Sequence, residues 1–158
     1  MLIPVGIALG SNLGNREAEL NAAVAFLRLI SYDGKVLEGP RIETEPDNCT
    51  PGSPPFLNSI AEILIESMEF PPLNLYGCLE DFEIERGRSP IRERNSPRPL
   101  DLDIIYYGQQ TFDQMGLIIP HCRAHQRRFV LEPLADLHPD LILPGQTKTV
   151  KQLLAELR

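Results

Sequence analysis

Between Leu100 and Ile105 the chain reads Leu-Asp-Leu-Asp-Ile-Ile, and this alternation constrains the fold more than any other segment. Apolar and acidic residues at a period of two indicate a β-strand with one apolar and one polar face. Asp101 and Asp103 then point to the same face, roughly 6.5–7 Å apart along the strand. Two carboxylates in such a context are costly unless solvent or a cation compensates them, so this face is either exposed or a metal site.

The patterns on either side of this strand predict an alternation of strands and helices. We expect strands at residues 2–9, 35–44, 56–65 and 100–107, and helices at about 15–30 and 71–87. This βαββαβ order is typical of the α+β ferredoxin-like fold, an antiparallel sheet with two helices on one face. A C-terminal extension is expected to add a short helix at 127–137, interrupted by Pro133, and another at 150–157. Residues 1–158 are treated as a single domain.

The charge distribution argues against a general nucleic-acid binder. The net charge is −7, with four basic and 14 acidic groups in residues 1–85 but 11 basic and eight acidic groups in residues 86–158. Arginines collected in one half favour a local site for a small anion, although they could also decorate a solvated face. No apolar run approaches the roughly 20 residues of a membrane helix, so no membrane partner is expected. The three cysteines lack metal-ligand spacing, which favours a reducing cytoplasm.

Two long loops are expected next to the strands. Residues 45–55 contain four prolines, and the segment before Asp101 is rich in arginine, with Arg86, Arg88, Arg92, Arg94 and Arg98. Guanidinium groups match phosphate oxygens and Mg²⁺ prefers carboxylate oxygens, so the combination points to phosphoryl transfer. Both loops are expected to close over bound substrates. Residues 10–15 lack the lysine and spacing of a Walker A loop, and we interpret them as a strand-to-helix turn rather than an anion site.

Four segments resemble the 6-hydroxymethyl-7,8-dihydropterin pyrophosphokinase family. They are Ala-Leu-Gly-Ser-Asn-Leu-Gly at 8–14, Phe-Leu-Asn at 56–58, Ser-Pro-Arg-Pro-Leu-Asp-Leu-Asp-Ile at 96–104, and Pro120-His121 through Phe-Val-Leu-Glu-Pro-Leu at 129–134. The resemblance implies transfer of the β,γ-pyrophosphoryl group of ATP to the pterin hydroxymethyl oxygen, with release of AMP, in folate biosynthesis.

The same resemblance implies roles for individual residues. Asp101 and Asp103 would bind two Mg²⁺ ions, and Asp103 would also take the substrate proton. Arg88 and Arg98 would assist the transfer. The expected ATP contacts are Glu83, Arg98, Ile104, His121 and Arg127. The expected pterin contacts are the rings of Phe56 and Phe129, the amide of Asn58, and Thr44.

Without the resemblance, several of these residues have ordinary structural interpretations. Phe56 and Phe129 suit a hydrophobic core, Glu83 suits a solvated helix surface, and His121 suits a turn. Two other functions also stay open: a different two-metal nucleotidyl or phosphodiester enzyme, and a non-enzymatic ferredoxin-like binding module. A monomer is expected. The sequence departs from the family pattern at Glu45, Asn95, Ser96 and Cys122, and none of these positions is an expected metal ligand or Arg98.

Overall fold

The computed structural model describes residues 1–45, 52–87 and 98–157. Its central sheet has the strand order β2-β4-β1-β5, with β3 also pairing with β4, and every pairing is antiparallel. The strands are β1 (Leu2–Ser11), β2 (Leu37–Glu38), β3 (Ile42–Thr44), β4 (Phe56–Glu66) and β5 (Asp101–Tyr107). Two helices, α1 (Arg16–Ile30) and α2 (Pro72–Glu85), complete the predicted ferredoxin-like core.

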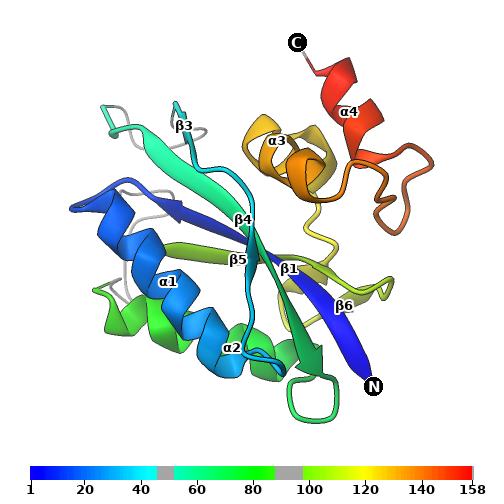
Figure 1. Cartoon of the computed structure of the whole chain (residues 1–158), viewed down its shortest axis with the longest axis horizontal. Helices are drawn as coiled ribbons and strands as arrows, with labels where there is room; N and C mark the ends of the chain where they lie inside the picture. Colours follow the sequence, from blue (N-terminus) through cyan, green and yellow to red (C-terminus); the bar gives the residue numbers. More distant parts are fainter. Residues whose placement is uncertain (46–51, 88–97, 158) are drawn as a thin grey trace.

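The two faces of the sheet are covered by different helices (Figure 1). Helices α1 and α2 pack on one face, where Leu20, Leu27, Leu75 and Leu79 are buried with the odd-numbered residues of β1. The other face is covered by α3 (Arg128–Leu137) and α4 (Val150–Glu156), whose Leu131, Leu134 and Val150 form a second cluster with Ile60. The C-terminal extension therefore supplies the second cover of the sheet.

Local signals in the sequence explain where these helices begin. Asn15 caps α1, because its Oδ1 accepts a hydrogen bond of 3.1 Å from the backbone N–H of Ala18. Pro72 is the first residue of α2, a position at which its missing N–H costs nothing. Thr149 and Gln152 form a reciprocal capping box at the start of α4.

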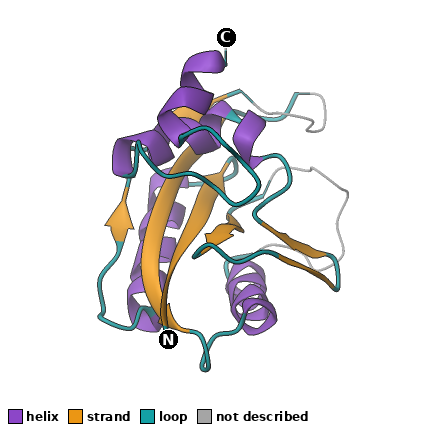
Figure 2. Cartoon of the chain, turned by 90° about the vertical axis from the view of Figure 1, so that its right-hand side faces the viewer, coloured by secondary structure: helices purple, strands orange, loops and turns teal. Residues whose placement is uncertain are grey.

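Three details differ from the sequence-based expectation. The strand expected at 35–44 is divided into β2 and β3 around Gly39 and Pro40, because proline cannot donate to a strand ladder. Helix α3 continues through Pro133, which is inside the helix rather than at a break. A hairpin of β6 (Phe112–Gln114) and β7 (Leu117–Ile119), seen beside the long strands in Figure 2, and a short 3-10 turn (Ala124–Gln126) were not expected.

No helix in the described ranges is both long and apolar enough to cross a membrane.

Candidate active site

The floor of the candidate site is one row of residues across three neighbouring strands. Gly10 of β1 is paired with Asn58 of β4 on one side and with Asp101 of β5 on the other. Two residues further along the same pair of strands, Ala8 is paired with Asp103. Strands lie about 4.7–4.9 Å apart, so the backbones of Asn58 and Asp101 are separated by roughly 9–10 Å. The predicted placement of both aspartates on one face of the strand is confirmed.

Gly10 keeps this floor open. A Cβ atom at this position would lie 3.2 Å from Oδ1 of Asn58 and 3.4 Å from the Phe56 ring. Because those contacts are tighter than most real Cβ contacts, a side chain would press on both groups. Gly10, which we expected to belong to the strand-to-helix turn, therefore also leaves space above the sheet.

A cavity lies over this floor and brings together residues that are far apart in the sequence. It is lined by residues of β1, β4 and β5 and by groups from β3 and the start of α3. Among the residues that we expected to bind pterin, ATP or metal, the lining includes Thr44, Phe56, Asn58, Arg98, Asp101, Asp103, Arg127 and Phe129. Glu45 also lines it, beside Thr44.

An arginine lies over each of the two aromatic rings. The guanidinium carbon of Arg98 is 5.2 Å from the ring centre of Phe56, and that of Arg127 is 5.2 Å from the ring centre of Phe129. Such cation–π contacts contribute about 0.5–2 kcal/mol each, depending on solvation. Arg98 also pairs with Asp101, with Nη2 and Oδ2 3.3 Å apart. Each of the two arginines that we expected to bind phosphate therefore contacts one of the two rings that we expected to bind pterin.

The amide of Asn58 is oriented by Thr44. Nδ2 of Asn58 donates to Oγ1 of Thr44 over 2.5 Å, and the Asn58 side chain is buried. This contact leaves Oδ1 on the side that faces Gly10 and the cavity. A fixed amide can present its oxygen and remaining N–H to the edge of a heterocycle.

Glu83 supports the aspartate strand from behind. It lies on α2, is only 4% exposed, and accepts a hydrogen bond of 2.6 Å from the backbone N–H of Leu102. Leu102 is the residue between the two aspartates, so Glu83 fixes the strand segment that presents them. The interpretation of Glu83 as a solvated helix carboxylate is therefore wrong.

Comparisons with known proteins show which family the chain belongs to. A family model described as 7,8-dihydro-6-hydroxymethylpterin-pyrophosphokinase (HPPK) matches residues 6–139. The chain belongs to this family. It is therefore a diphosphokinase that uses ATP and a hydroxymethyldihydropterin as substrates, in folate synthesis. The binding-module and phosphodiester alternatives are set aside by this result.

Similar proteins cover nearly the whole chain. The 2-amino-4-hydroxy-6-hydroxymethyldihydropteridine pyrophosphokinase of Pseudomonas aeruginosa is 37% identical over 145 residues, which is 91% of this chain and 86% of that protein. The protein of the same name from Haemophilus influenzae is 36% identical and covers 96% and 93%, respectively. A folate synthesis bifunctional protein of Arabidopsis thaliana is 40% identical, over 84% of this chain but 26% of that protein.

A solved structure shares the fold. The Plasmodium falciparum HPPK-DHPS crystal structure with pteroate has a TM-score of 0.72 and 14% identity; the match covers 99% of this chain and 42% of that one. This likeness confirms the predicted ferredoxin-like architecture with its C-terminal extension.

Not every expected HPPK site residue lines the cavity. The side chain of Ile104 is buried in the core beneath α1 and α2, so only its backbone could reach a nucleotide. Arg88, Arg92 and Arg94, together with Asn95 and Ser96, lie outside the described residues. Arg86 was counted with the phosphate-binding arginines, but it ends α2 and makes two 3.0 Å hydrogen bonds with Glu19 of α1.

His121 does not line the cavity, but it lies within electrostatic reach of Arg127 and Asp101, which do. Burial lowers its pKa most, the positive charge of Arg127 lowers it further, and Asp101 acts in the opposite direction. The backbone N–H of Arg123 lies 3.3 Å from Nδ1 of His121 and donates to it, so the ring proton belongs on Nε2. A neutral Nε2–H donor next to an arginine suits a phosphate oxygen.

Asn12 is a contributor that the sequence analysis missed. It is 1% exposed, and its Oδ1 accepts from the N–H of Arg98 over 2.9 Å while its Nδ2 donates to the carbonyl of Pro54 over 3.3 Å. Its own N–H donates to the carbonyl of Arg98 over 3.3 Å. Asn12 thus ties Arg98 to the end of the loop that precedes β4. The Gly-Ser-Asn turn was the available signal, but we interpreted it only as a turn.

The donor set at the cavity fits Mg²⁺. Asp101 and Asp103 are partly exposed and lie on one face of β5, and the described part of the chain holds no group of three or more candidate metal ligands. Mg²⁺ is commonly held by one or two carboxylates together with water and substrate phosphates, so two aspartates are sufficient.

Proposed function

We propose that this cavity is the site of pyrophosphoryl transfer, with the pterin between Phe56 and Phe129 and the ATP phosphates over Asp101 and Asp103. The observation that carries the proposal is that one cavity contains two aromatic rings, a fixed amide, the two aspartates of β5 and two arginines. A flat heterocycle needs the rings and the amide, and a triphosphate needs the charged groups.

In this proposal the pterin hydroxyl oxygen attacks the β-phosphorus of ATP. An O–P bond forms there, the bond from the β-phosphorus to the oxygen bridging it to the α-phosphate breaks, and AMP leaves with that oxygen. Asp103 takes the hydroxyl proton. Arg98, paired with Asp101, and Arg127 lie where they can meet the charge that develops on the phosphate oxygens. Arg88 has the same role in the proposal.

Asp101 and Asp103 would hold two Mg²⁺ ions. Bound there, the ions would neutralise phosphate charge and lower the pKa of the acceptor hydroxyl. The residues that orient this pair are part of the chain itself: Glu83 fixes the intervening Leu102, and Arg98 restrains Asp101. His121, Arg127 and the backbone of Ile104 complete the proposed nucleotide contacts, while Glu83 contributes to the ATP site only through Leu102. Thr44 completes the pterin contacts through Asn58.

Residues 1–158 are proposed to act as a single-domain monomer in the cytoplasm, with small molecules rather than nucleic acid as partners. The negative net charge and the free thiols of Cys78 and Cys122 support this. Sedimentation at equilibrium that gave a stable dimer would contradict the monomer.

The decisive test of the reaction is incubation with Mg-ATP and 6-hydroxymethyl-7,8-dihydropterin. We expect AMP and the pterin diphosphate in equal amounts, with AMP release dependent on both the pterin and Mg²⁺. Formation of ADP would contradict pyrophosphoryl transfer, and AMP release without pterin would point to a hydrolase or nucleotidyl-transferring enzyme instead.

A further inference from the structure

The strand that carries Thr44 has little backbone support of its own. β3 is only three residues long, and β4 is the strand with which it pairs, in the register Ile42 to Asn58 and Thr44 to Phe56. Short edge strands open easily, because few ladder hydrogen bonds and few buried contacts hold them. The position of Thr44 beside Asn58 must therefore depend on contacts outside the ladder.

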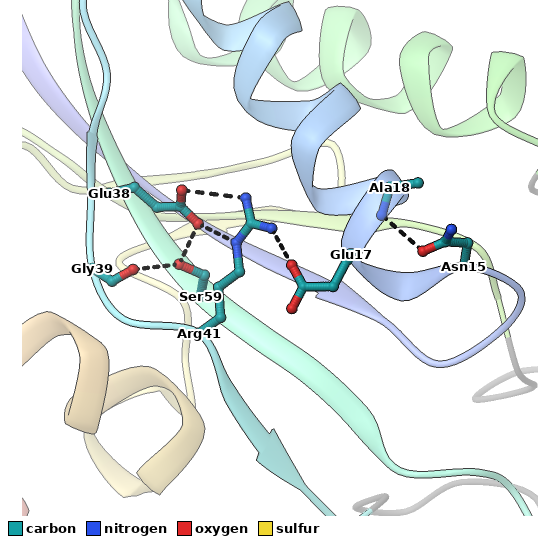
Figure 3. Close-up of polar contacts among 7 residues, drawn as sticks. All are labelled: Asn15, Glu17, Ala18, Glu38, Gly39, Arg41 and Ser59. Atoms are coloured by element: carbon teal, nitrogen blue, oxygen red, sulfur yellow. Dashed lines mark hydrogen bonds and ion pairs between the residues drawn. The ribbon is translucent and has the colours of Figure 1, made fainter.

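Arg41, just before β3, makes such contacts (Figure 3). Its Nε donates to Glu38 over 2.8 Å, and its Nη1 donates to Glu17 of α1 over 2.6 Å. The side chain of Arg41 is 19% exposed, compared with 63% for Glu17 and 22% for Glu38. The two carboxylates raise the pKa of Arg41 above its ordinary value, with Glu38 as the largest cause. One guanidinium thus joins the β2–β3 segment to helix α1.

The carboxylate of Glu38 connects this group to the central sheet. It accepts a hydrogen bond of 3.0 Å from Oγ of Ser59, which also donates to the carbonyl of Gly39 over 3.1 Å. Ser59 is fully buried on β4 and is the neighbour of Asn58 in the sequence. The network therefore runs from α1 through Arg41 and Glu38 to the strand that holds the Asn58 amide.

A second ion pair of opposite polarity lies beside the first. Arg16 of α1 binds Glu43 of β3 over 2.8 Å and the carbonyl of Pro55 over 3.1 Å. Arg16 and Glu17 are consecutive residues, and their partners, Glu43 and Arg41, lie two residues apart on one extended segment. A slip of the β3 segment by two residues would bring Arg41 to Arg16 in one direction, or Glu43 to Glu17 in the other. Either slip places like charges together, so the charge pattern favours a single register.

We propose that Arg41, held by Glu17 and Glu38, is a positioning residue for the pterin site. It acts through β3 by keeping Thr44 where it orients the Asn58 amide, and it does not itself line the cavity. The inference rests on the proposed function, because it takes Thr44 and Asn58 as pterin contacts.

The test compares Arg41→Met with Arg41→Lys and with Lys148→Met, the matched control. Lys148 pairs with Glu156 at the end of α4, far from β3 in the sequence and absent from the cavity lining. Only part of the loss of the charged hydrogen bonds acts on the pterin, so we expect Arg41→Met to raise the pterin Kd and KM roughly three- to thirtyfold. Arg41→Lys should fall between this variant and the wild type, and Lys148→Met should match the wild type.

The ATP Kd separates positioning from general damage. We expect it to stay within about twofold of the wild-type value in Arg41→Met, because the ATP contacts do not involve β3. An unchanged pterin Kd, or an equal weakening of both substrates, would overturn the proposal.

Hydrogen exchange separates failure of this inference from failure of the proposed function. In the substrate-free protein, the amides of Ile42 and Thr44 should exchange faster in Arg41→Met than in Lys148→Met, while those of β1 stay protected. If wild-type protein bound no pterin, the proposed function would fail, whereas the exchange rates would still decide whether Arg41 holds β3. Unchanged exchange at both amides would contradict the inference by itself.

Discussion

The floor of the site and its walls are held by different interactions. The floor consists of Asn58, Gly10 and Asp101 on three long strands, and their backbones are held by the β1–β4 and β1–β5 ladders. The walls come from short or irregular segments: Thr44 on β3, Arg98 before β5, and Arg127 and Phe129 at the start of α3. Side-chain contacts rather than ladders hold these walls. The comparison predicts that loss of a floor carboxylate affects chemistry with an intact fold, whereas loss of the wall side chains Thr44 or Phe129 affects substrate affinity.

The largest effect is expected for Asp103→Asn on the floor. Losing the carboxylate that is proposed to hold Mg²⁺ and to take the proton should lower kcat at least about a thousandfold, in the range of losing a major electrostatic contribution. The urea midpoint should change little, because Asp103 is partly exposed on a strand whose ladder is unaltered. Asp113→Asn, an exposed acid on β6, is the control and should retain full activity in the AMP-release assay.

Glu83→Ala tests whether the floor depends on the hydrogen bond between Glu83 of α2 and the backbone of β5. The N–H of Leu102 would lose its acceptor in a buried position, which costs about 1–3 kcal/mol of unfolding free energy. Activity should also fall, because both aspartates flank Leu102. Urea unfolding and AMP release measure the two effects, and Glu80→Ala, an exposed change on the same helix, provides the comparison. A Glu83→Ala protein with unchanged stability would show that the floor needs no such support.

The two aromatic rings compare a residue of a long strand with a residue of a wall, because Phe56 begins β4 and Phe129 lies at the start of α3. Phe129 is partly exposed, so Phe129→Ala should weaken pterin binding roughly tenfold to a hundredfold, as expected for a lost stacking contact of about 1–3 kcal/mol. Phe56 starts β4 and is 9% exposed, so Phe56→Ala should cost folding stability as well as affinity. Calorimetric titration and thermal unfolding separate these outcomes. Equal loss of stability in both variants would remove the distinction.

The smallest effect concerns the imidazole of His121. Its pKa should lie below the ordinary value of about 6.5, should rise in Arg127→Met and should fall further in Asp101→Asn. Because the folded pKa is lowered, its contribution to stability is complete above the unfolded value and is lost as pH falls through the folded value. An NMR titration of the His121 ring protons, without substrates, measures the pKa in the wild type and in the two variants. A wild-type pKa above 6.5 would contradict the burial argument.

The sequence was most informative where backbone periodicity alone decides the outcome. The order of the long strands and the common face of Asp101 and Asp103 followed from period-two patterns. The hairpin of β6 and β7 was missed, because strands of three residues carry too little pattern. Pro133 was expected to interrupt a helix that in fact continues, since the packing of α3 outweighs the one lost hydrogen bond.

Apart from Arg98, which the arginine-rich segment indicated, the walls were predictable only through the family resemblance, and the contacts that hold the walls were not predictable. A hydrogen bond such as that from Leu102 to Glu83 joins residues 19 positions apart and leaves no periodic signal. The same holds for Asn12, whose partners lie 42 and 86 residues away. Local pattern identifies which residues face the cavity, whereas long-range packing decides what holds them there.

The row through Gly10 has a consequence for the choice of substrate. In the proposed arrangement, the backbones of Asn58, which binds the pterin edge, and of Asp101, which lies beneath the phosphates, are two strand spacings apart. This separation of roughly 9–10 Å is set by backbone hydrogen bonding. The strand spacing therefore sets the distance between the proposed pterin site and the proposed phosphate site. In the proposed arrangement, an acceptor alcohol on a longer arm would overshoot the phosphorus and one attached directly to the ring would not reach it.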